Sequence, residues 1–290
     1  MALSLSLGEK PTICHNELMS NTNVRYLVFD IESVTDGDLL AKTKYPGDQL
    51  SAQQAIQKYR SFLMQKYESD FIPYTFQIPI SIVVGKVAAD FSLLDLVSLD
   101  EPGFRPHVVT QHFWLGWEKY KRPTLVSFNG RTFDIPLLEL AAFRYGISLA
   151  KWFRWRDKSY EQPRHRYNFE GHFDLQEVLT NFGASRLNGG LNLAANLIGK
   201  PGKLDVEGSM VQDMFDAGKL REIDDYCRCD VLDTYFVFLR TMVLIGEIEL
   251  AREQELVQQT KEWLEENSVK RPIYSTYLAA WGNWTSPWDA

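Results

Sequence analysis

Two acidic residues follow an apolar run near the start of the chain. Residues 26–33 read YLVFDIES, so Asp30 and Glu32 are separated by one apolar residue. Residues two apart in a β-strand point to the same face, and the two carboxylates would lie side by side. Such a pair favours a bound cation, and a hard divalent metal ion suits paired oxygen ligands. A strand that runs out into solvent also fits this stretch, so a metal site and a solvated strand end both stay open.

A second acidic cluster occurs about one hundred residues later, in SFNGRTFDIPLL (127–138). Asn129 follows a short apolar strand, and Asp134 lies where a loop passes into a helix. An acid at that position is favoured by the helix dipole whether or not it has a catalytic role. Asp134 is therefore either a second contributor to a metal site or a simple N-terminal helix acid.

A third cluster, IDDYCRCDVLDTYFVFLR (223–240), lies in a long helical pattern. Tyr226 and Asp230 are four residues apart, so they share one face of the helix. Asp230 lies beside the apolar stripe, where a carboxylate is costly unless it is paired. A buried tyrosine with an exposed aspartate beside it is the alternative. We expect the other acids of this helix to face solvent: Asp224, Asp225 and Asp233.

The three clusters together resemble the DEDD superfamily of 3′→5′ exonucleases, which have an RNase H-like fold. Tyr226 matches the DEDDy branch, because the histidine branch places His where this chain has Asp225. The segments LVSFNGRTFDIPLLELAAFRYG, HFDLQ, IGKPGK and YCRCDVLDTYFVFLR are similar to the predicted exonuclease family related to the proofreading domain of family B polymerases. The resemblance covers residues 24–246. No polymerase domain follows in this sequence, so we expect a free-standing exonuclease.

The resemblance implies a role for each matching residue. Asp30, Glu32, Asp134 and Asp230 would hold two Mg²⁺ or Mn²⁺ ions, and Tyr226 would orient the attacking water. Two ions about 3.5–4 Å apart activate the water and stabilise the departing 3′ oxygen. A tyrosine hydroxyl can hold the water without acting as a metal ligand. Asn129 and Phe133 are expected to contact substrate, whereas Asp174 is expected to be structural.

The elements that would position these residues form an α/β fold, an RNase H-like mixed β-sheet flanked by α-helices. Strands are expected mostly early in the chain, including a β-branched strand at 75–89 in which Pro79 marks an irregularity or an edge. Helices are expected at 51–67, with Ser51 as N-cap, and from about 219 to 245. We expect four parts: a flexible arm at 1–23, an exonuclease domain at 24–250, an insertion within it at 33–73, and a C-terminal helix with a Trp-rich tail at 251–290.

Composition restricts the class of protein. The 290 residues are 45% hydrophobic, and no apolar run approaches the roughly 18 residues of a membrane span. The first residues show no signal-peptide pattern, and three cysteines indicate a reducing, cytoplasmic location. Cys227 and Cys229 are interpreted as packing residues.

A net charge of −7 argues against a surface that follows long duplex nucleic acid.

One segment departs from the acidic average. Residues 151–172 carry six basic residues against three acids, a formal net charge of +3, with aromatic residues interleaved. Aromatic rings can stack on the bases of a single strand, and basic side chains can contact its phosphates. Arg164 and Arg166 are therefore candidates for holding a single strand near the metals. A solvated loop whose aromatic rings fill the edge of the core is the alternative. The Trp-rich tail, with Trp281, Trp284 and Trp288, is either a docking segment for a protein partner or a strap on the domain.

The preferred function is a metal-dependent exonuclease that releases nucleoside monophosphates from single-stranded 3′ ends. DNA is favoured over RNA by family analogy alone, because nothing in the sequence identifies a contact to the 2′-hydroxyl. Two alternatives stay open. One is an RNA-specific exonuclease, and the other is a catalytically silent nucleic-acid-binding or scaffold module of the same fold.

Overall fold

A five-stranded mixed β-sheet forms the centre of the protein, in the strand order β3-β2-β1-β4-β5. The computed structural model describes residues 24–203, 208–282 and 284–288, so the predicted arm at 1–23 lies outside the described residues. β1, β2 and β3 pair antiparallel, whereas β4 runs parallel to β1 and β5 parallel to β4. The strands are β1 (Val24–Thr35), β2 (Gln77–Ala88), β3 (Leu93–Ser98), β4 (Thr124–Ser127) and β5 (His172–Asp174).

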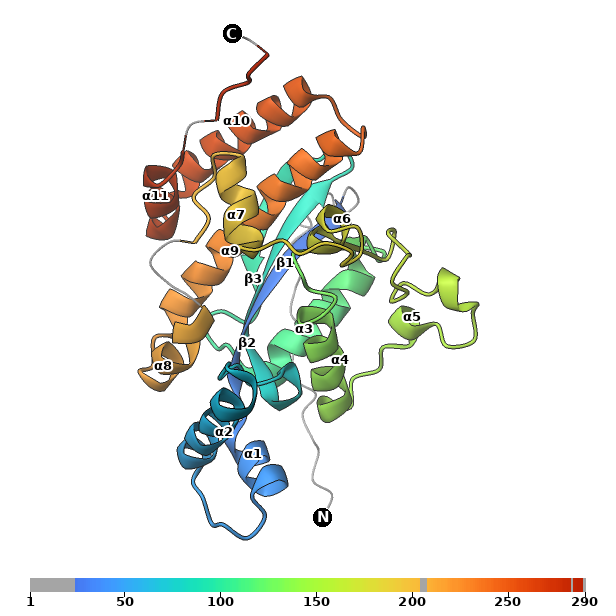
Figure 1. Cartoon of the computed structure of the whole chain (residues 1–290). Helices are drawn as coiled ribbons and strands as arrows, with labels where there is room; N and C mark the ends of the chain where they lie inside the picture. Colours follow the sequence, from blue (N-terminus) through green and yellow to red (C-terminus); the bar gives the residue numbers. More distant parts are fainter. Residues whose placement is uncertain (1–23, 204–207, 283, 289–290) are drawn as a thin grey trace, which may run out of the picture.

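Helices cover both faces of the sheet (Figure 1). The long helix α9 lies on one face and carries α7, α10 and α11, whereas α3 and α4 lie on the other. The predicted α/β class, a mixed sheet flanked by helices, is confirmed. No helix in the described part of the chain is long and apolar enough to cross a membrane. The helices are α1 (Gly37–Lys44), α2 (Ala52–Tyr67), α3 (Pro106–Lys119), α4 (Asp134–Tyr145), α5 (Ala150–Phe153), α6 (Leu175–Leu179), α7 (Gly190–Leu197), α8 (Val211–Asp216), α9 (Leu220–Leu244), α10 (Leu250–Asn267) and α11 (Pro272–Ala279).

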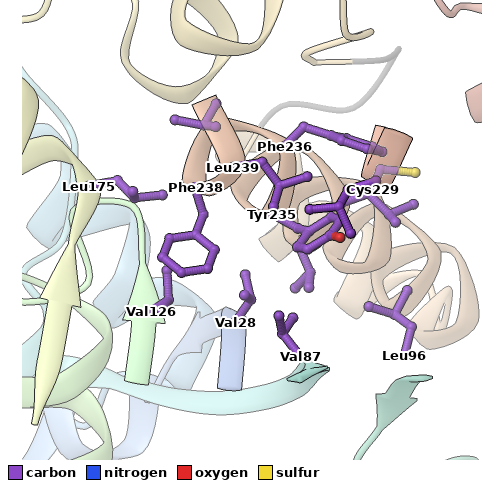
Figure 2. Close-up of a cluster of buried hydrophobic side chains, with 14 of the residues drawn as sticks. Val28, Val87, Leu96, Val126, Leu175, Cys229, Tyr235, Phe236, Phe238 and Leu239 are labelled. Atoms are coloured by element: carbon purple, nitrogen blue, oxygen red, sulfur yellow. The ribbon is translucent and has the colours of Figure 1, made fainter. Parts of the chain in front are cut away.

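The alternation of β1 decides which way its acidic residues point. Val28 packs in the core under α9, where Figure 2 shows it close to Phe238 and Tyr235. Phe29 packs in the opposite core with α3 and α4. Side chains two apart share a face, so Asp30 and Glu32 follow Val28 toward α9.

The pairing of β1 brings these acids to the end of a parallel strand pair. β4 pairs with β1 only over Tyr26–Val28, so the acids lie beyond the paired stretch. β2 follows β1 along its length, with a register shift between Glu32 and Ser33, which faces Pro79. The predicted irregularity at Pro79 is therefore confirmed. The carboxyl ends of parallel strands form the edge where α/β proteins commonly bind ligands.

The predicted insertion is a small helical unit at that edge (Figure 1). α1 and α2 pack on each other around their own apolar cluster, which includes Leu40, Ile56 and Leu63. Ser51 caps α2 in a capping box with Gln54, which confirms the predicted N-cap. The insertion thus has a defined structure beside the sheet.

The prediction that the remaining acids of α9 face solvent is wrong for two of them. Asp224 and Asp233 are 1% and 0% exposed, and Asp225 is half-buried. Asp224 pairs with Arg228 at 3.0 Å and accepts a hydrogen bond from Ser81, and Asp233 accepts one from the Tyr277 hydroxyl at 2.6 Å. Arg228 lies one turn further along α9, at a spacing that helical periodicity can show, whereas Ser81 and Tyr277 come from other elements, of which it gave no sign.

The C-terminal segment packs on the core formed by α9. Leu256 and Tyr277 of α10 and α11 lie in the same apolar cluster as α9. Trp281 stacks edge-on against Phe236, and the Arg240 guanidinium lies 4.1 Å from the centroid of Trp284. This part of the tail is a strap. The side chain of Trp288 is 83% exposed, so docking of a partner there stays a prediction.

Candidate active site

The two acids of β1 lie against α9. Glu32 is buried at 7% exposure and Asp30 is half-buried. The Cys227 Sγ lies 3.4 Å from the main-chain oxygen of Asp30 and 3.7 Å from its Oδ2. One carboxylate oxygen of Asp30, one of Glu32 and the Cys227 Sγ all lie within 4.8 Å of one another. Burial raises the pKa of the Cys227 thiol well above its usual value, so it stays protonated. Cys227 is therefore a packing residue, as predicted, but one in contact with the acidic site.

Asp134 reaches the same region from the end of β4. It is the first residue of α4 and is 6% exposed. The preceding loop turns through Asn129, whose φ of +64° is in the left-handed region that asparagine tolerates. A Cβ at Gly130 would lie 2.3 Å from Ser127 Oγ and 2.9 Å from Asp134 Oδ2, so only glycine permits this approach.

Asp174 holds this loop in place, in agreement with its predicted structural role. Its carboxylate accepts hydrogen bonds from the main-chain N–H groups of Asn129 at 3.0 Å and Arg131 at 2.8 Å. It also caps α6 by accepting from the Gln176 N–H at 3.0 Å. Because these donors come from two segments, Asp174 ties the loop before Asp134 to the sheet.

Tyr226 and Asp230 are contributed by α9. Tyr226 is 6% exposed and Asp230 is half-buried, one turn further along the helix. Burial raises the pKa of the Tyr226 hydroxyl, and the charges of Asp230 and Glu32 raise it further. The phenol therefore stays protonated and keeps its hydrogen as a donor.

One pocket of about 500 Å³ joins the acids of all three segments. Asp30, Glu32, Asp134 and Asp230 all line it, together with the predicted substrate residues Asn129 and Phe133. Its remaining wall is mainly aromatic and apolar: Ile31, Phe71, Pro73, Tyr74, Phe128 and Thr132.

The pocket concentrates negative charge. Burial raises the pKa of Asp134 to about 7, helped by the charge of Asp174, and burial raises that of Asp230 to about 6. Burial and the neighbouring acids also hold the pKa values of Asp30 and Glu32 well above their usual range. Within the described ranges, none of the four carboxylates forms an ion pair with a basic side chain. Four carboxylates that line one pocket supply the oxygen donors that suit hard divalent ions.

The structure does not bring Arg164 and Arg166 to this pocket. Arg164 pairs with Glu139 at 2.8 Å, and its guanidinium lies 4.5 Å from the centroid of Phe153. Arg166 pairs with Glu177 at 2.8 Å. Neither arginine lines the acidic pocket, and their predicted role in substrate binding stays a prediction.

The sequence interpretation missed the contribution of the insertion. Phe71 lines the acidic pocket, and its ring centroid lies 5.9 Å from that of Phe133. The available signal was the aromatic-rich stretch FIPYTF (71–76) directly before β2. It could not be linked to Asp134 without the tertiary structure.

A family model described as "Predicted 3'-5' exonuclease related to the exonuclease domain of PolB" matches residues 69–281. The chain belongs to this family. It is accordingly a predicted 3′-5′ exonuclease, a hydrolase that acts on nucleic acid. The match to this exonuclease family contains Asp134, Tyr226 and Asp230, but it begins after Asp30 and Glu32. It continues through α11, further than the resemblance seen in the sequence.

One similar solved structure is the family B DNA polymerase from the hyperthermophilic archaeon Pyrobaculum calidifontis. The two chains share 14% sequence identity with a TM-score of 0.47. The similarity covers 76% of this exonuclease chain and 24% of the polymerase chain. No curated protein sequence matches the chain.

Proposed function

We propose that the protein is a metal-dependent exonuclease that releases nucleoside monophosphates from the 3′ ends of single-stranded nucleic acid, with DNA preferred. The observation that supports it is the meeting of four carboxylates from β1, α4 and α9 in one pocket. Acids from such distant segments are costly to bury together unless cations compensate them.

Asp30, Glu32, Asp134 and Asp230 would hold two Mg²⁺ or Mn²⁺ ions. Bound divalent ions lower the pKa of a water molecule and stabilise the departing 3′ oxygen. The donor set supports this assignment because carboxylate oxygens suit both ions.

The other residues of the site would orient the substrate. Tyr226 keeps its hydroxyl hydrogen and can donate it to the attacking water or to a phosphate oxygen. Asn129 and Phe133 line the pocket next to the acids, where an amide and a ring can contact the terminal nucleotide. Asp174 would act only by holding the loop that carries them.

Two wider proposals rest on the sequence. The sparse cysteines support a cytoplasmic location. The exposed ring of Trp288 supports docking of a protein partner on the tail. Both are separate from the reaction.

The experiment is digestion of 5′-labelled single-stranded DNA and RNA of one sequence, in Mg²⁺, in Mn²⁺ and in EDTA. We expect a ladder of shortened DNA that requires the ion and is lost in the folded Asp30→Asn, Asp134→Asn double variant. Asp213→Asn is the control, because Asp213 is exposed and lies outside the pocket.

The outcomes separate the candidate functions. A ladder on RNA alone would replace the DNA preference with the RNA-specific alternative. Binding without any cleavage would indicate a catalytically silent module. Cleavage that persists in the folded double variant would contradict the proposed metal site.

A further inference from the structure

The insertion places an exposed aromatic ring at the mouth of the acidic pocket. Phe71 is 61% exposed, although large apolar side chains are usually covered. Its ring faces Phe133 with 5.9 Å between centroids and an angle of 50° between planes. Phe133 directly precedes Asp134, so the ring pair lies beside one of the four acids.

The position of Phe71 is fixed through the adjacent residue Ile72. Gln77 donates to the main-chain oxygen of the adjacent Ile72 at 2.8 Å and accepts from the Ser33 hydroxyl at 2.8 Å. Ile72 is buried in the insertion's own apolar cluster. The insertion is joined to α4 by an ion pair between Asp36 and Arg144. The ring of Phe71 is thus exposed, while the backbone next to it is anchored through Ile72.

A second cavity adjoins the acidic pocket at the ring pair. It has a volume of about 390 Å³ and shares Ile31, Glu32, Phe71 and Phe133 with the acidic pocket. Arg60 of α2 and Lys203 also line it, as do Asp70 and Glu32. Its walls therefore combine aromatic rings with both signs of charge, whereas the charged residues of the acidic pocket are all acids.

We propose that the insertion forms the second wall of the substrate cleft, with Phe71 stacking, together with Phe133, on the base of the 3′-terminal nucleotide. This inference rests on the proposed exonuclease function. Every base has a flat π-face and can stack on an exposed ring, so stacking does not depend on the nucleotide sequence. This suits an enzyme that removes successive nucleotides. The adjoining cavity then receives the terminal nucleotide while its phosphate lies at the acids.

The test measures binding of a labelled single-stranded oligonucleotide in Ca²⁺, chosen to slow cleavage. Stacking of one base changes affinity by about 5- to 150-fold, so Phe71→Ala is expected to weaken binding within that range. Phe71→Tyr keeps the ring and is expected to bind like wild type. Phe143→Ala is the matched control, because Phe143 is 85% exposed on α4 but lines neither cavity.

A second oligonucleotide, without its 3′-terminal base, tests the stacking by itself. Removal of the 3′-terminal base from the labelled oligonucleotide is expected to lower its affinity for wild type. The same removal is expected to change its affinity for Phe71→Ala only slightly. An oligonucleotide that lacks an internal base far from the 3′ end is expected to show the same loss in both proteins. Equal losses for wild type and Phe71→Ala on the terminally abasic strand would overturn the inference.

The result is separable from the proposed function. If wild type shortens 3′ ends and folded Phe71→Ala binds the oligonucleotide as tightly as wild type, Phe71 has no role in binding, but the exonuclease function stands. Wild type that neither binds nor cleaves would instead contradict the exonuclease itself. The melting temperature of Phe71→Ala is expected to match wild type, since the ring is mostly exposed.

Discussion

The carboxyl groups of the pocket lie where their charged forms are disfavoured. Asp134 and Asp230 have pKa values of about 7 and 6 in the ion-free protein, chiefly because they are buried. Both values lie above the ordinary value near 4 for an aspartate in an unfolded chain. The ion-free fold therefore carries a cost at neutral pH that bound cations would remove.

This cost gives a pH dependence with a definite sign. Between about pH 4 and 7 Asp134 and Asp230 bind more protons in the ion-free folded protein than in the unfolded chain, so their contribution to the free energy of unfolding falls as pH rises. Melting temperatures in EDTA are expected to fall across this window, and those of Asp134→Asn to fall less. Added Mn²⁺ is expected to stabilise wild type more at pH 8 than at pH 5. A profile of Asp134→Asn in EDTA that falls as steeply as that of wild type would contradict the raised pKa of Asp134.

Tyr226 offers a test of a single hydroxyl. Tyr226→Phe keeps the buried ring and removes the donor, and loss of such positioning lowers rates by about 10²–10⁴-fold. The single-turnover rate is expected to fall in this range, while the rise in melting temperature caused by Mn²⁺ stays as in wild type. Tyr160→Phe, on an exposed ring, is the control. A fully active Tyr226→Phe would make this tyrosine a core residue.

At the scale of elements, the basic segment 151–172 is held on the protein by its arginines. Arg164 donates through Nε and Nη2 to Glu139, and Arg166 pairs through Nε with Glu177 and donates through Nη2 to Phe182 O. In the described part of the chain no partner is found for either Nη1. Each side chain is partly exposed, which leaves room for a phosphate contact.

Salt dependence measures that contact directly. Each phosphate neutralised on a single strand contributes about −0.7 to the slope of log affinity against log salt. If Arg164 and Arg166 hold two phosphates, Arg164→Ala with Arg166→Ala flattens the slope by about 1.4. Binding in Ca²⁺ across a salt series gives the value, with Arg221→Ala as a matched control. An unchanged slope in the folded double variant would favour the solvated-loop alternative.

At the scale of the whole molecule, buried ion pairs join the C-terminal helices to the sheet. Arg228 of α9 is 3% exposed and pairs with Asp224 at 3.0 Å and with Glu101 at 3.3 Å. Glu101 also pairs with Arg271, which precedes α11. The loop after β3, the core of α9 and the start of α11 therefore meet in one network.

Breaking this network is expected to destabilise the whole fold. Arg228→Met removes one partner and leaves Asp224 buried without its cation, which typically costs about 3–5 kcal/mol. Urea unfolding followed by circular dichroism measures the loss. Lys219→Met is the control, because its exposed pair with Glu222 contributes at most about 1 kcal/mol. A loss of similar size in both variants would show that the buried network adds no stability.

Local rules were enough to predict much of the fold. The alternation in YLVFDIES placed Asp30 and Glu32 on one face, the four-residue spacing placed Tyr226 with Asp230, and Ser51 marked the start of α2. Each of these depends on contacts between residues near one another in the chain. The order of the three acidic clusters then led to the exonuclease family.

Only the tertiary structure decided what lies around those acids. The burial of Asp224 and Asp233 depends on the distant Ser81 and Tyr277, and helical periodicity cannot show which segment covers a face. Phe71 reaches Phe133 because the insertion folds back on the sheet edge, more than 60 residues away in the chain. Sequence patterns report local geometry, whereas the pairing of buried charges and the walls of a pocket depend on contacts between segments far apart in the chain.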